Sequence, residues 1–193
     1  MKTLVFATSN DHKLYEIRSI LHNYQILGLK DIDIYENIEE TGTTLEENAI
    51  IKATFLYEKT GKPSFSEDTG LEVDYLDGAP GVHTARYAGE NRDANANMDL
   101  LLQKLEGIIE RSAQFRTVIA YITTDGCKLF EGIVKGKIAT SKEGKDGFGY
   151  DPIFIPEGYQ ETFAVLNAEI KNSISHRAMA IQALTQYLRS LPQ

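Results

Sequence analysis

The sequence predicts an α/β protein with a mixed β-sheet flanked by helices. At the N-terminus a buried-strand pattern, residues 4–7, is followed by an amphipathic helix pattern, residues 11–23. Further along, residues 115–123 and 128–138 form strand patterns around Asp125-Gly126, a strong hairpin signal. Because β-α units and a long hairpin occur in one chain, we expect strands of both directions in the sheet.

The elements between these patterns follow from local signals. Residues 25–29 resemble a second strand. Thr43 and Thr44 are each followed three residues later by Glu, a capping-box signature, and their helix runs to about Thr60, where a glycine and a proline end it. The remaining expected elements are strands at 63–65 and 71–75 on either side of a loop at 66–70, helices at 93–105 and 175–189, and a glycine-rich loop at 144–149.

Composition narrows the class of protein. The chain has 193 residues, 42% of them hydrophobic, which predicts a single domain over residues 1–193 without a separable linker. A net charge of −8 argues against nonspecific binding of duplex nucleic acid, although a few converging cations can still bind a small anion. The single cysteine, Cys127, has no disulfide partner, and the longest apolar run, residues 118–122, is too short to span a membrane. With no leader-like segment, we expect a cytoplasmic protein with neither a membrane nor a nucleic acid partner.

The turn Thr8-Ser9-Asn10, with Lys13 shortly after it, joins the first strand to the first helix. Ser, Thr and Asn are ordinary N-caps, so a helix cap explains them without any ligand. A lysine in the first turn opposes the helix dipole, whereas free N–H groups, hydroxyls and an ammonium together make an anion site. Both interpretations stay open on this motif alone.

Lys52 interrupts the apolar face of the second predicted helix. Leu45, Ala49 and Leu56 share that face, and Asn48 lies one turn before Lys52 on the same side. Either Lys52 extends along the edge of the core, which is common, or the face borders an acidic or phosphate-filled cleft.

Two acidic pairs, Glu39-Glu40 and Glu67-Asp68, lie in predicted loops. Adjacent acids in loops are usually solvated. Carboxylates from two loops can also hold an octahedral Mg²⁺ that keeps several waters for substrate phosphates. A carboxylate beside such a metal can deprotonate a water for attack on phosphorus.

Lys171, His176 and Arg177 bring positive charge to the start of the last predicted helix. The helix dipole opposes this unless an anion or an aromatic ligand compensates, although His176 by itself fits an ordinary surface or core histidine. An aromatic glycine loop, Phe-Gly-Tyr-Asp at 148–151, precedes them. The Walker loop, the dinucleotide fingerprint, the Gly-x-Ser-x-Gly elbow and the His-Glu-x-x-His helix are all absent from the sequence.

Taken in order, these features form a specific set that covers nearly the whole chain. The motifs are Thr8-Ser9-Asn10-x-x-Lys13, Glu40-Thr41-Gly42, Glu47-Asn48-Ala49-x-x-Lys52-Ala53, Glu67-Asp68-Thr69-Gly70-Leu71, Gly78-Ala79-Pro80-Gly81, Ala85-Arg86-Tyr87, Phe148-Gly149-Tyr150-Asp151-Pro152 and Ser175-His176-Arg177. The set resembles the inosine triphosphate pyrophosphatases, a family that removes non-standard purine nucleotides.

The resemblance implies an elongated two-lobed α/β fold with a central mixed β-sheet flanked by helices, an active-site cleft between the lobes, and a homodimer. It also implies Mg²⁺-dependent hydrolysis of ITP, dITP and XTP to the monophosphate and pyrophosphate, which cleanses the nucleotide pool. Carried over by position, Asp68 resembles the general base and a metal ligand, with Glu40 as the other ligand. The implied substrate contacts are Thr8, Ser9, Asn10, Lys13 and Lys52 at the triphosphate, Thr69, Phe148 stacked on the base, and Gly149, Tyr150, Asp151, Lys171, His176 and Arg177 around the purine.

Three positions depart from the family pattern. The family usually has Asp-Asp-Ser-Gly where this chain has Glu67-Asp68-Thr69-Gly70, and His83 stands where Tyr is common. Two other functions therefore stay open: a nucleotide pyrophosphatase that favours a modified pyrimidine or a standard nucleotide, and a noncatalytic nucleotide sensor. The presence of both Glu40 and Asp68 argues against the sensor.

Overall fold

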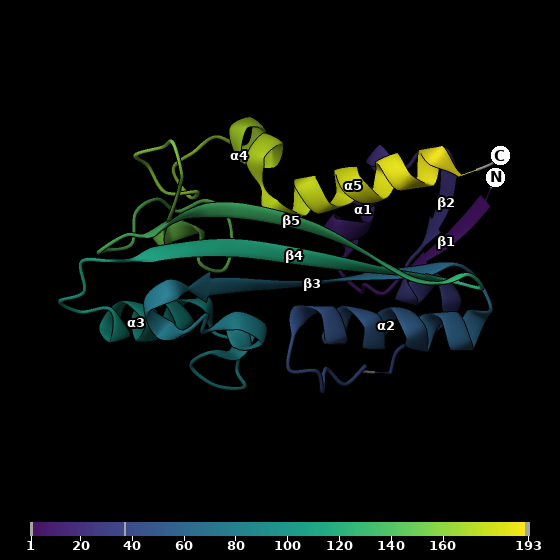
Figure 1. The fold of residues 1–193 in the computed structure, drawn as a ribbon, viewed down its shortest axis with the longest axis horizontal. Coiled ribbons are helices and arrows are strands. Elements are labelled where there is room, and N and C mark those ends of the chain that lie inside the picture. The colour runs from purple at the N-terminus through teal and green to yellow at the C-terminus, as the bar shows by residue number, and fades with distance from the viewer. Residues whose placement is uncertain (1, 37, 192–193) are drawn as a thin grey trace. The chain divides into compact units, whose positions relative to one another are not determined.

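The computed structural model describes residues 2–36 and 38–191. Across these residues six strands form one sheet in the order β2-β1-β3-β4-β5-β6 (Figure 1). The strands are β1 (Lys2–Phe6), β2 (Tyr24–Leu27), β3 (Ser64–Val73), β4 (Ser112–Thr123), β5 (Gly126–Ile138) and β6 (Phe154–Pro156). β1 pairs in parallel with β2 and with β3, whereas β5 and β6 are antiparallel. The predicted mixed sheet is confirmed.

Helices flank this sheet and complete the α/β fold. They are α1 (Asp11–Ile20), α2 (Leu45–Thr60), α3 (Ala94–Lys104), α4 (Ala168–Ile174) and α5 (His176–Ser190). Within the described part of the chain, every helix is too short or too polar to cross a membrane.

The chain folds into two compact units, each assembled from segments that are distant in sequence. The first unit comprises Met1–Asp68, Thr117–Glu131 and Ala180–Gln193, and the second comprises Thr69–Arg116 and Gly132–Met179. Neither unit is one continuous segment, so no single cut in the chain separates them. A single domain over residues 1–193 and an active-site cleft between two lobes stay predictions.

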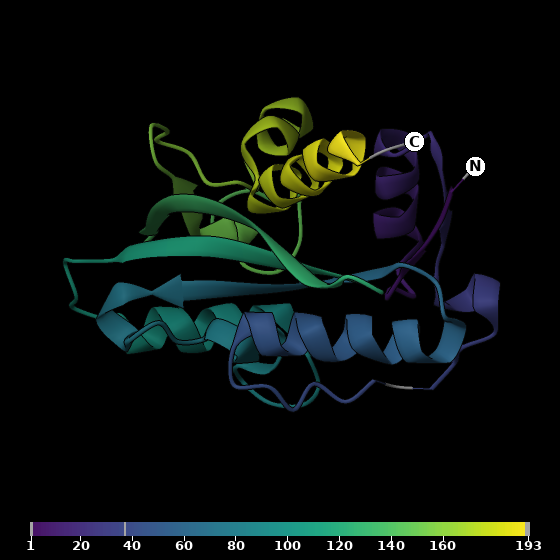
Figure 2. The same cartoon turned by 45° about the vertical axis from the view of Figure 1, so that its right-hand side comes forward.

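In the first unit, α1 and α5 cover one face of the sheet (Figures 1 and 2). Phe6 and Phe65, on the neighbouring strands β1 and β3, stack with their ring centroids 4.5 Å apart. Ile17 of α1 and Leu184 of α5 are buried in the same apolar cluster. Burial of these side chains fixes both helices against β1 and β3, the strands that lead to the candidate site.

The opposite face of the first unit is covered by α2 (Figure 2). This helix begins at a complete capping box: the Thr44 hydroxyl accepts the Glu47 N–H, and the Glu47 carboxylate accepts the Thr44 N–H. It ends at Gly61, whose φ of 62° is in the left-handed region that favours glycine. Both ends lie where the sequence predicts them.

In the second unit an aromatic core forms around Phe115, whose ring lies 4.7 Å from Phe154 and 6.3 Å from Phe163. Leu101 of α3 is fully buried in the same cluster. Asp93 caps α3 through its carboxylate, which accepts the N–H groups of the second and third helical residues. The helix predicted at 93–105 is confirmed within one residue at each end.

The prediction of a loop at 66–70 between two short strands is wrong. β3 runs without a break from Ser64 to Val73 and carries both acids. Ser66 is fully buried and its hydroxyl donates to the Ala49 carbonyl at 2.6 Å, while Glu67 is 8% exposed. The acidic pair does not interrupt the strand because each carboxylate has a lysine partner.

The helix predicted at 175–189 is confirmed as α5 within one residue at each end. Ser175 is extended, with φ −69° and ψ 147°, and its hydroxyl accepts the Ala178 N–H, so it caps α5 instead of lying inside it. The short helix α4, which carries Lys171, precedes this break and was not predicted. Smaller shifts of one to three residues occur at the end of α1 and at the hairpin turn, whose tip is Thr124-Asp125.

Candidate active site

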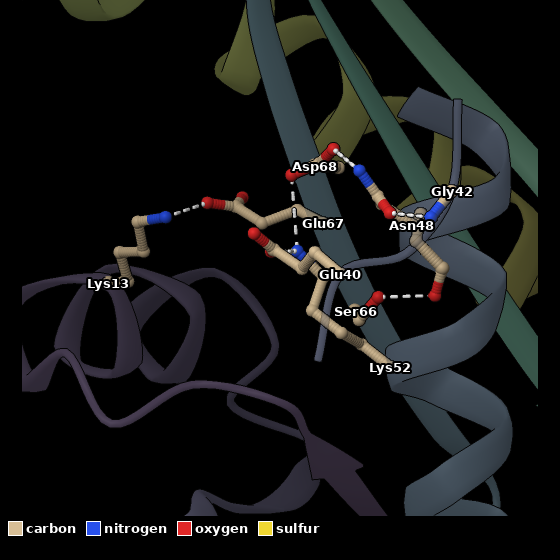
Figure 3. A network of polar contacts seen from close by, with 9 residues as sticks. Lys13, Glu40, Gly42, Asn48, Lys52, Ser66, Glu67 and Asp68 are labelled. Carbon is tan, nitrogen blue, oxygen red and sulfur yellow. Dashed lines mark hydrogen bonds and ion pairs between the residues drawn. The ribbon is translucent and has the colours of Figure 1, made fainter. Parts of the chain in front are cut away.

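Two carboxylates of the first unit converge on one ammonium group (Figure 3). Lys52 Nζ lies 2.6 Å from Glu40 Oε1 and 3.1 Å from Asp68 Oδ1. The side chains of Lys52 and Asp68 are only 12% and 15% exposed, and that of Glu40 is 31% exposed. The structure therefore brings together three of the residues that the sequence analysis assigned to the reaction centre.

Each of the three is placed by a different element. Lys52 lies two turns into α2, between Ala49 and Leu56, which are both fully buried, so the lysine does interrupt an apolar face. Asp68 lies on β3 and contacts that helix through Asn48 and Lys52. Glu40 lies in the segment that enters α2, which bends at Thr43-Thr44 just before the helix begins.

The charges of this group shift the pKa of its members. Burial alone would lower the pKa of Lys52, but the charges of Asp68 and Glu40 outweigh it and raise the pKa above the usual lysine value. Burial raises the pKa of the Asp68 carboxyl; Lys52 opposes that rise and the charge of Glu40 adds to it, so the pKa lies above the usual range. A second cation near the two carboxylates would favour their charged forms.

The donor set fits a magnesium ion. Mg²⁺ prefers carboxylate oxygens, keeps several waters, and is commonly held by one or two carboxylates together with substrate phosphates. Glu40 and Asp68 supply such a pair, and Lys52 already places one positive charge between them. Among the described residues no cluster of three or more His, Cys, Asp or Glu side chains could hold a metal, so a magnesium site here would be built on this pair of carboxylates.

A second ion pair lies on the other face of β3. Lys13 Nζ of α1 is 2.6 Å from Glu67 Oε1, and the Glu67 side chain is only 5% exposed (Figure 3). Successive residues of a strand point to opposite faces, so Glu67 is directed to α1 and Asp68 to α2. The residue that departs from the family pattern thus holds the lysine assigned to the triphosphate.

The turn before α1 has the geometry of a helix cap. Thr8 is 9% exposed and its hydroxyl accepts the Asn10 N–H at 3.1 Å, and the side-chain oxygen Oδ1 of Asn10 accepts the Lys13 N–H at 3.3 Å. Ser9 is exposed. The capping interpretation is confirmed, and it leaves the proposed anion contacts of these residues as a prediction. Thr69 continues β3 directly after Asp68.

In the second unit a largely exposed aromatic ring stands beside two cations. Phe148 is 63% exposed. Lys171 Nζ lies 4.8 Å from the centre of its ring and Arg177 Cζ lies 5.7 Å from it. An exposed ring next to hydrogen-bond donors is suited to stack on a flat ligand while the donors bind its polar edge.

Asp151 holds this group in place. Its carboxylate, 5% exposed, accepts the Phe148 N–H at 2.7 Å and forms a short ion pair with Lys171. The carboxylate packs so closely on Gly147, whose φ is 86°, that a Cβ there has no room. Gly149, with φ 62°, completes the tight loop that presents the ring.

Tyr150 and His176 are largely buried beneath the loop. Tyr150 is 3% exposed and donates its hydroxyl to the Thr84 carbonyl at 2.9 Å, and burial raises the pKa of this hydroxyl. His176 is 7% exposed and stacks on Phe115 at 4.9 Å. His83 is exposed on a 3₁₀ turn of the same unit.

Sequence reasoning missed the role of Asn48. Its side chain is hydrogen-bonded both to the backbone beside Glu40 and to Asp68. The sequence does place Asn48 one turn before Lys52 on the same face of α2, and this position is the feature from which a role could have been predicted. The pairing of Lys13 with Glu67 was also missed, because the two acids were expected in one loop.

Comparisons with known proteins identify the family of this chain. The model of the Ham1 family matches residues 4–187. A dITP/XTP pyrophosphatase of Porphyromonas gingivalis is 52% identical over 190 residues, which are 97% of this chain and 98% of the relative, and one of Flavobacterium psychrophilum is 50% identical over 188 residues, 97% and 99% of the two chains.

Solved structures give the same result. The Staphylococcus aureus Ham1 protein matches with a TM-score of 0.94 at 42% identity, covering 97% of this chain and 98% of that one. A HAM1 protein from Coxiella burnetii matches with a TM-score of 0.94 at 37% identity, covering 99% and 100%. Sequence and fold agree over nearly the full length, and this chain belongs to the Ham1 family.

Proposed function

We propose that this chain is an enzyme that hydrolyses non-standard purine nucleoside triphosphates, ITP, dITP and XTP, to the monophosphate and pyrophosphate. The observation that carries the proposal is the convergence of Glu40 and Asp68 on Lys52, a pair of partly buried carboxylates around a cation in a Ham1 chain. The dITP/XTP pyrophosphatases that are about half identical to it support the choice of substrates.

In the proposed reaction Asp68 is the general base. It takes a proton from a water that attacks the triphosphate, and the α–β phosphoanhydride bond breaks to release pyrophosphate. Lys52 and Lys13 offset the negative charge that develops on the phosphate oxygens. Mg²⁺, held by Glu40 and Asp68, would add positive charge at the phosphates and favour ionisation of the water.

The proposed base pocket is the group around Phe148. Its exposed ring would stack on the purine, and Lys171 and Arg177 supply donors for an exocyclic oxygen. A 6-amino group opposite those donors would leave them unpaired, which penalises adenine nucleotides. Asp151 would act by holding the loop and Lys171.

Three further assignments complete the proposal. We propose Mg²⁺ as the metal, a homodimer as the assembly, and the cytoplasm, which holds the nucleotide pool, as the location. No nucleic acid or membrane partner is included. The acidic balance of the chain, with a net charge of −8, supports the first of these two exclusions.

A substrate panel tests the function. Purified protein is given ITP, dITP, XTP, dUTP, GTP and ATP, with and without Mg²⁺, and pyrophosphate release is measured. We expect kcat/KM for the 6-oxo purines ITP and XTP to exceed that for ATP by at least about 100-fold, because a site built around donors rejects a ligand that leaves them unpaired. A preference for dUTP or for ATP would contradict the proposed substrate class, and binding without turnover would favour a sensor.

The role of Lys13 gives a second prediction. Replacing Lys13 with Met should raise KM for ITP about tenfold, since a hydrogen bond to a charged group contributes roughly 1.5–3 kcal/mol. The matched control is Lys30→Met, which removes the same charge from an exposed ion pair with Asp11 at 3.0 Å. Equal KM values for the two variants would remove Lys13 from the triphosphate site.

A further inference from the structure

Asn48 makes two hydrogen bonds that join the segment carrying Glu40 to Asp68 (Figure 3). It lies in the first turn of α2 and is 2% exposed. Its Oδ1 accepts the Gly42 N–H at 2.8 Å, and its Nδ2 donates to Asp68 Oδ2 at 3.3 Å. One amide group therefore contacts Asp68 itself and the backbone two residues after Glu40.

The chemistry of these two partners requires an amide. The Gly42 N–H needs an acceptor and the Asp68 carboxylate needs a donor, so the carbonyl and NH₂ ends of Asn48 have only one productive orientation. An Asp side chain at this position would have no donor for Asp68, and an apolar side chain would leave both partners without this contact. A buried polar group that loses its partner costs about 1–3 kcal/mol.

The segment that Asn48 holds is also packed tightly on α2. A Cβ at Gly42 would lie 2.6 Å from the Glu47 Cβ and 2.7 Å from Asn48 Oδ1, so only glycine fits. The N–H groups of Thr43 and Thr44 donate to the same Glu47 carboxylate. These contacts leave the backbone two residues after Glu40 little freedom to move.

We propose that Asn48 is a positioning residue that fixes the geometry of the carboxylate pair Glu40 and Asp68 for a divalent cation. The inference rests on the proposed function in one respect only, namely that the cation bound by the two carboxylates serves nucleotide hydrolysis. It assigns Asn48 no contact with substrate. Residues that orient metal ligands from behind typically change metal affinity by about 10–100-fold when they are replaced.

The test measures cation binding without nucleotide and without turnover. Mn²⁺, which suits the same carboxylate ligands, is titrated into the nucleotide-free protein and the free ion is followed by electron paramagnetic resonance. We expect Asn48→Ala to weaken Mn²⁺ binding about tenfold or more and to speed hydrogen exchange at the Gly42 amide. Alanine is favoured in helices, so α2 should still form. If Asn48→Ala does not fold, the same two measurements are made on Asn48→Ser, whose side chain is too short to reach both partners.

The matched control is Ser66→Ala. It also removes a buried hydrogen bond between β3 and α2, from the Ser66 hydroxyl to the Ala49 carbonyl, but this bond contacts neither carboxylate. The control should keep Mn²⁺ affinity within about twofold of wild type. Equal Mn²⁺ affinity in wild type and the folded Asn48 variant, equal loss in both variants, or no Mn²⁺ binding by wild type would each overturn the inference.

Kinetics separate this inference from the proposed function. Asn48→Ala should lower kcat/KM for ITP most at limiting Mg²⁺ and recover in part as Mg²⁺ is raised, because its defect is in metal binding. If wild-type protein bound Mn²⁺ but released no pyrophosphate from any nucleotide, the proposed function would be wrong. The comparison of Mn²⁺ affinity between wild type and Asn48→Ala would still test the role of Asn48. If saturating Mg²⁺ restored none of the kcat/KM that Asn48→Ala loses, the defect would not lie in metal binding, which would contradict a positioning role for Asn48.

Discussion

Replacing Asp68 with Asn should abolish most pyrophosphate release from ITP while changing the stability of the protein little at neutral pH. A positioned general base contributes about 10²–10⁴-fold to a rate, and the carboxamide cannot take the proton. The variant should retain nucleotide binding, because Lys13 and Lys52 remain. Pyrophosphate release at saturating ITP and Mg²⁺ measures the loss.

The stability of this variant follows from the direction of the pKa shift. Burial and the charge of Glu40 hold the pKa of Asp68 above its usual value, despite Lys52. Between the usual and the raised pKa, the folded protein binds more protons at this site than the unfolded chain, so stability falls as pH rises through that window. Above it the ionised carboxylate weakens the fold, and Asp68→Asn removes that cost together with the charge that raises the pKa of Lys52, so the two effects oppose each other.

The control for Asp68→Asn is Asp99→Asn, which makes the same chemical change in an exposed ion pair between Asp99 and Lys142 at 2.7 Å. It should leave turnover within about twofold of wild type, since surface pairs contribute little. Two results would contradict the assignment: near-wild-type turnover of Asp68→Asn, or a large fall in its melting temperature at pH 7.

Local sequence signals predicted those parts of the fold that depend on neighbouring residues. The capping box at Thr44 and the glycine at position 61 set both ends of α2, and the three- and four-residue spacing of its apolar positions placed Lys52 in a buried face. These features involve contacts within a few residues, so the sequence alone contains them. The hairpin and α3 were predicted for the same reason.

The errors lie where contacts distant in sequence decide. Glu67-Asp68 suggested a solvated loop, yet β3 continues because Lys13 of α1 and Lys52 of α2 pair with the two acids from opposite faces. A local spacing pattern cannot predict contacts with lysines that are more than fifteen residues away in the sequence. The short helix α4 is a different case: it was not predicted although its cap is local, with the Asn167 side chain accepting the Ile170 N–H.

The site was predicted as a set of residues but not as a set of contacts. Motif order pointed to Asp151 at the purine pocket; the structure shows its carboxylate engaged with the Phe148 N–H and with Lys171. Asn48 belongs to the motif Glu47-Asn48-Ala49-x-x-Lys52-Ala53, but the motif alone predicted no role for it. Residue types and order indicate which side chains gather, whereas hydrogen-bond directions depend on the folded backbone.

Replacing Lys52 with Met should have the second large effect, and it should act on turnover and on metal binding in opposite directions. Turnover should fall about 10²–10³-fold, since a preorganised positive charge at the phosphates is lost. Mn²⁺ binding to the nucleotide-free protein should become tighter, because the ammonium that lies 2.6 Å from Glu40 and 3.1 Å from Asp68 no longer competes with the ion.

Stability should reveal the same competition. Without Lys52 the two carboxylates repel each other in a poorly solvated place, and breaking a fully buried ion pair costs about 3–5 kcal/mol. The cost here is smaller because the Glu40 side chain is 31% exposed. Added Mg²⁺ should therefore raise the melting temperature of Lys52→Met more than that of wild type, as expected for a ligand that binds the folded state more tightly.

The control is Lys59→Met, on the same helix, which removes an exposed lysine paired with Glu36 at 3.0 Å. It matches the change in charge and length but contacts neither Glu40 nor Asp68, so its turnover, Mn²⁺ affinity and response to Mg²⁺ should equal those of wild type. If Lys52→Met bound Mn²⁺ no more tightly than Lys59→Met, the ammonium and the cation would not share one place. The two carboxylates would then lose their assignment as metal ligands, even if turnover had fallen.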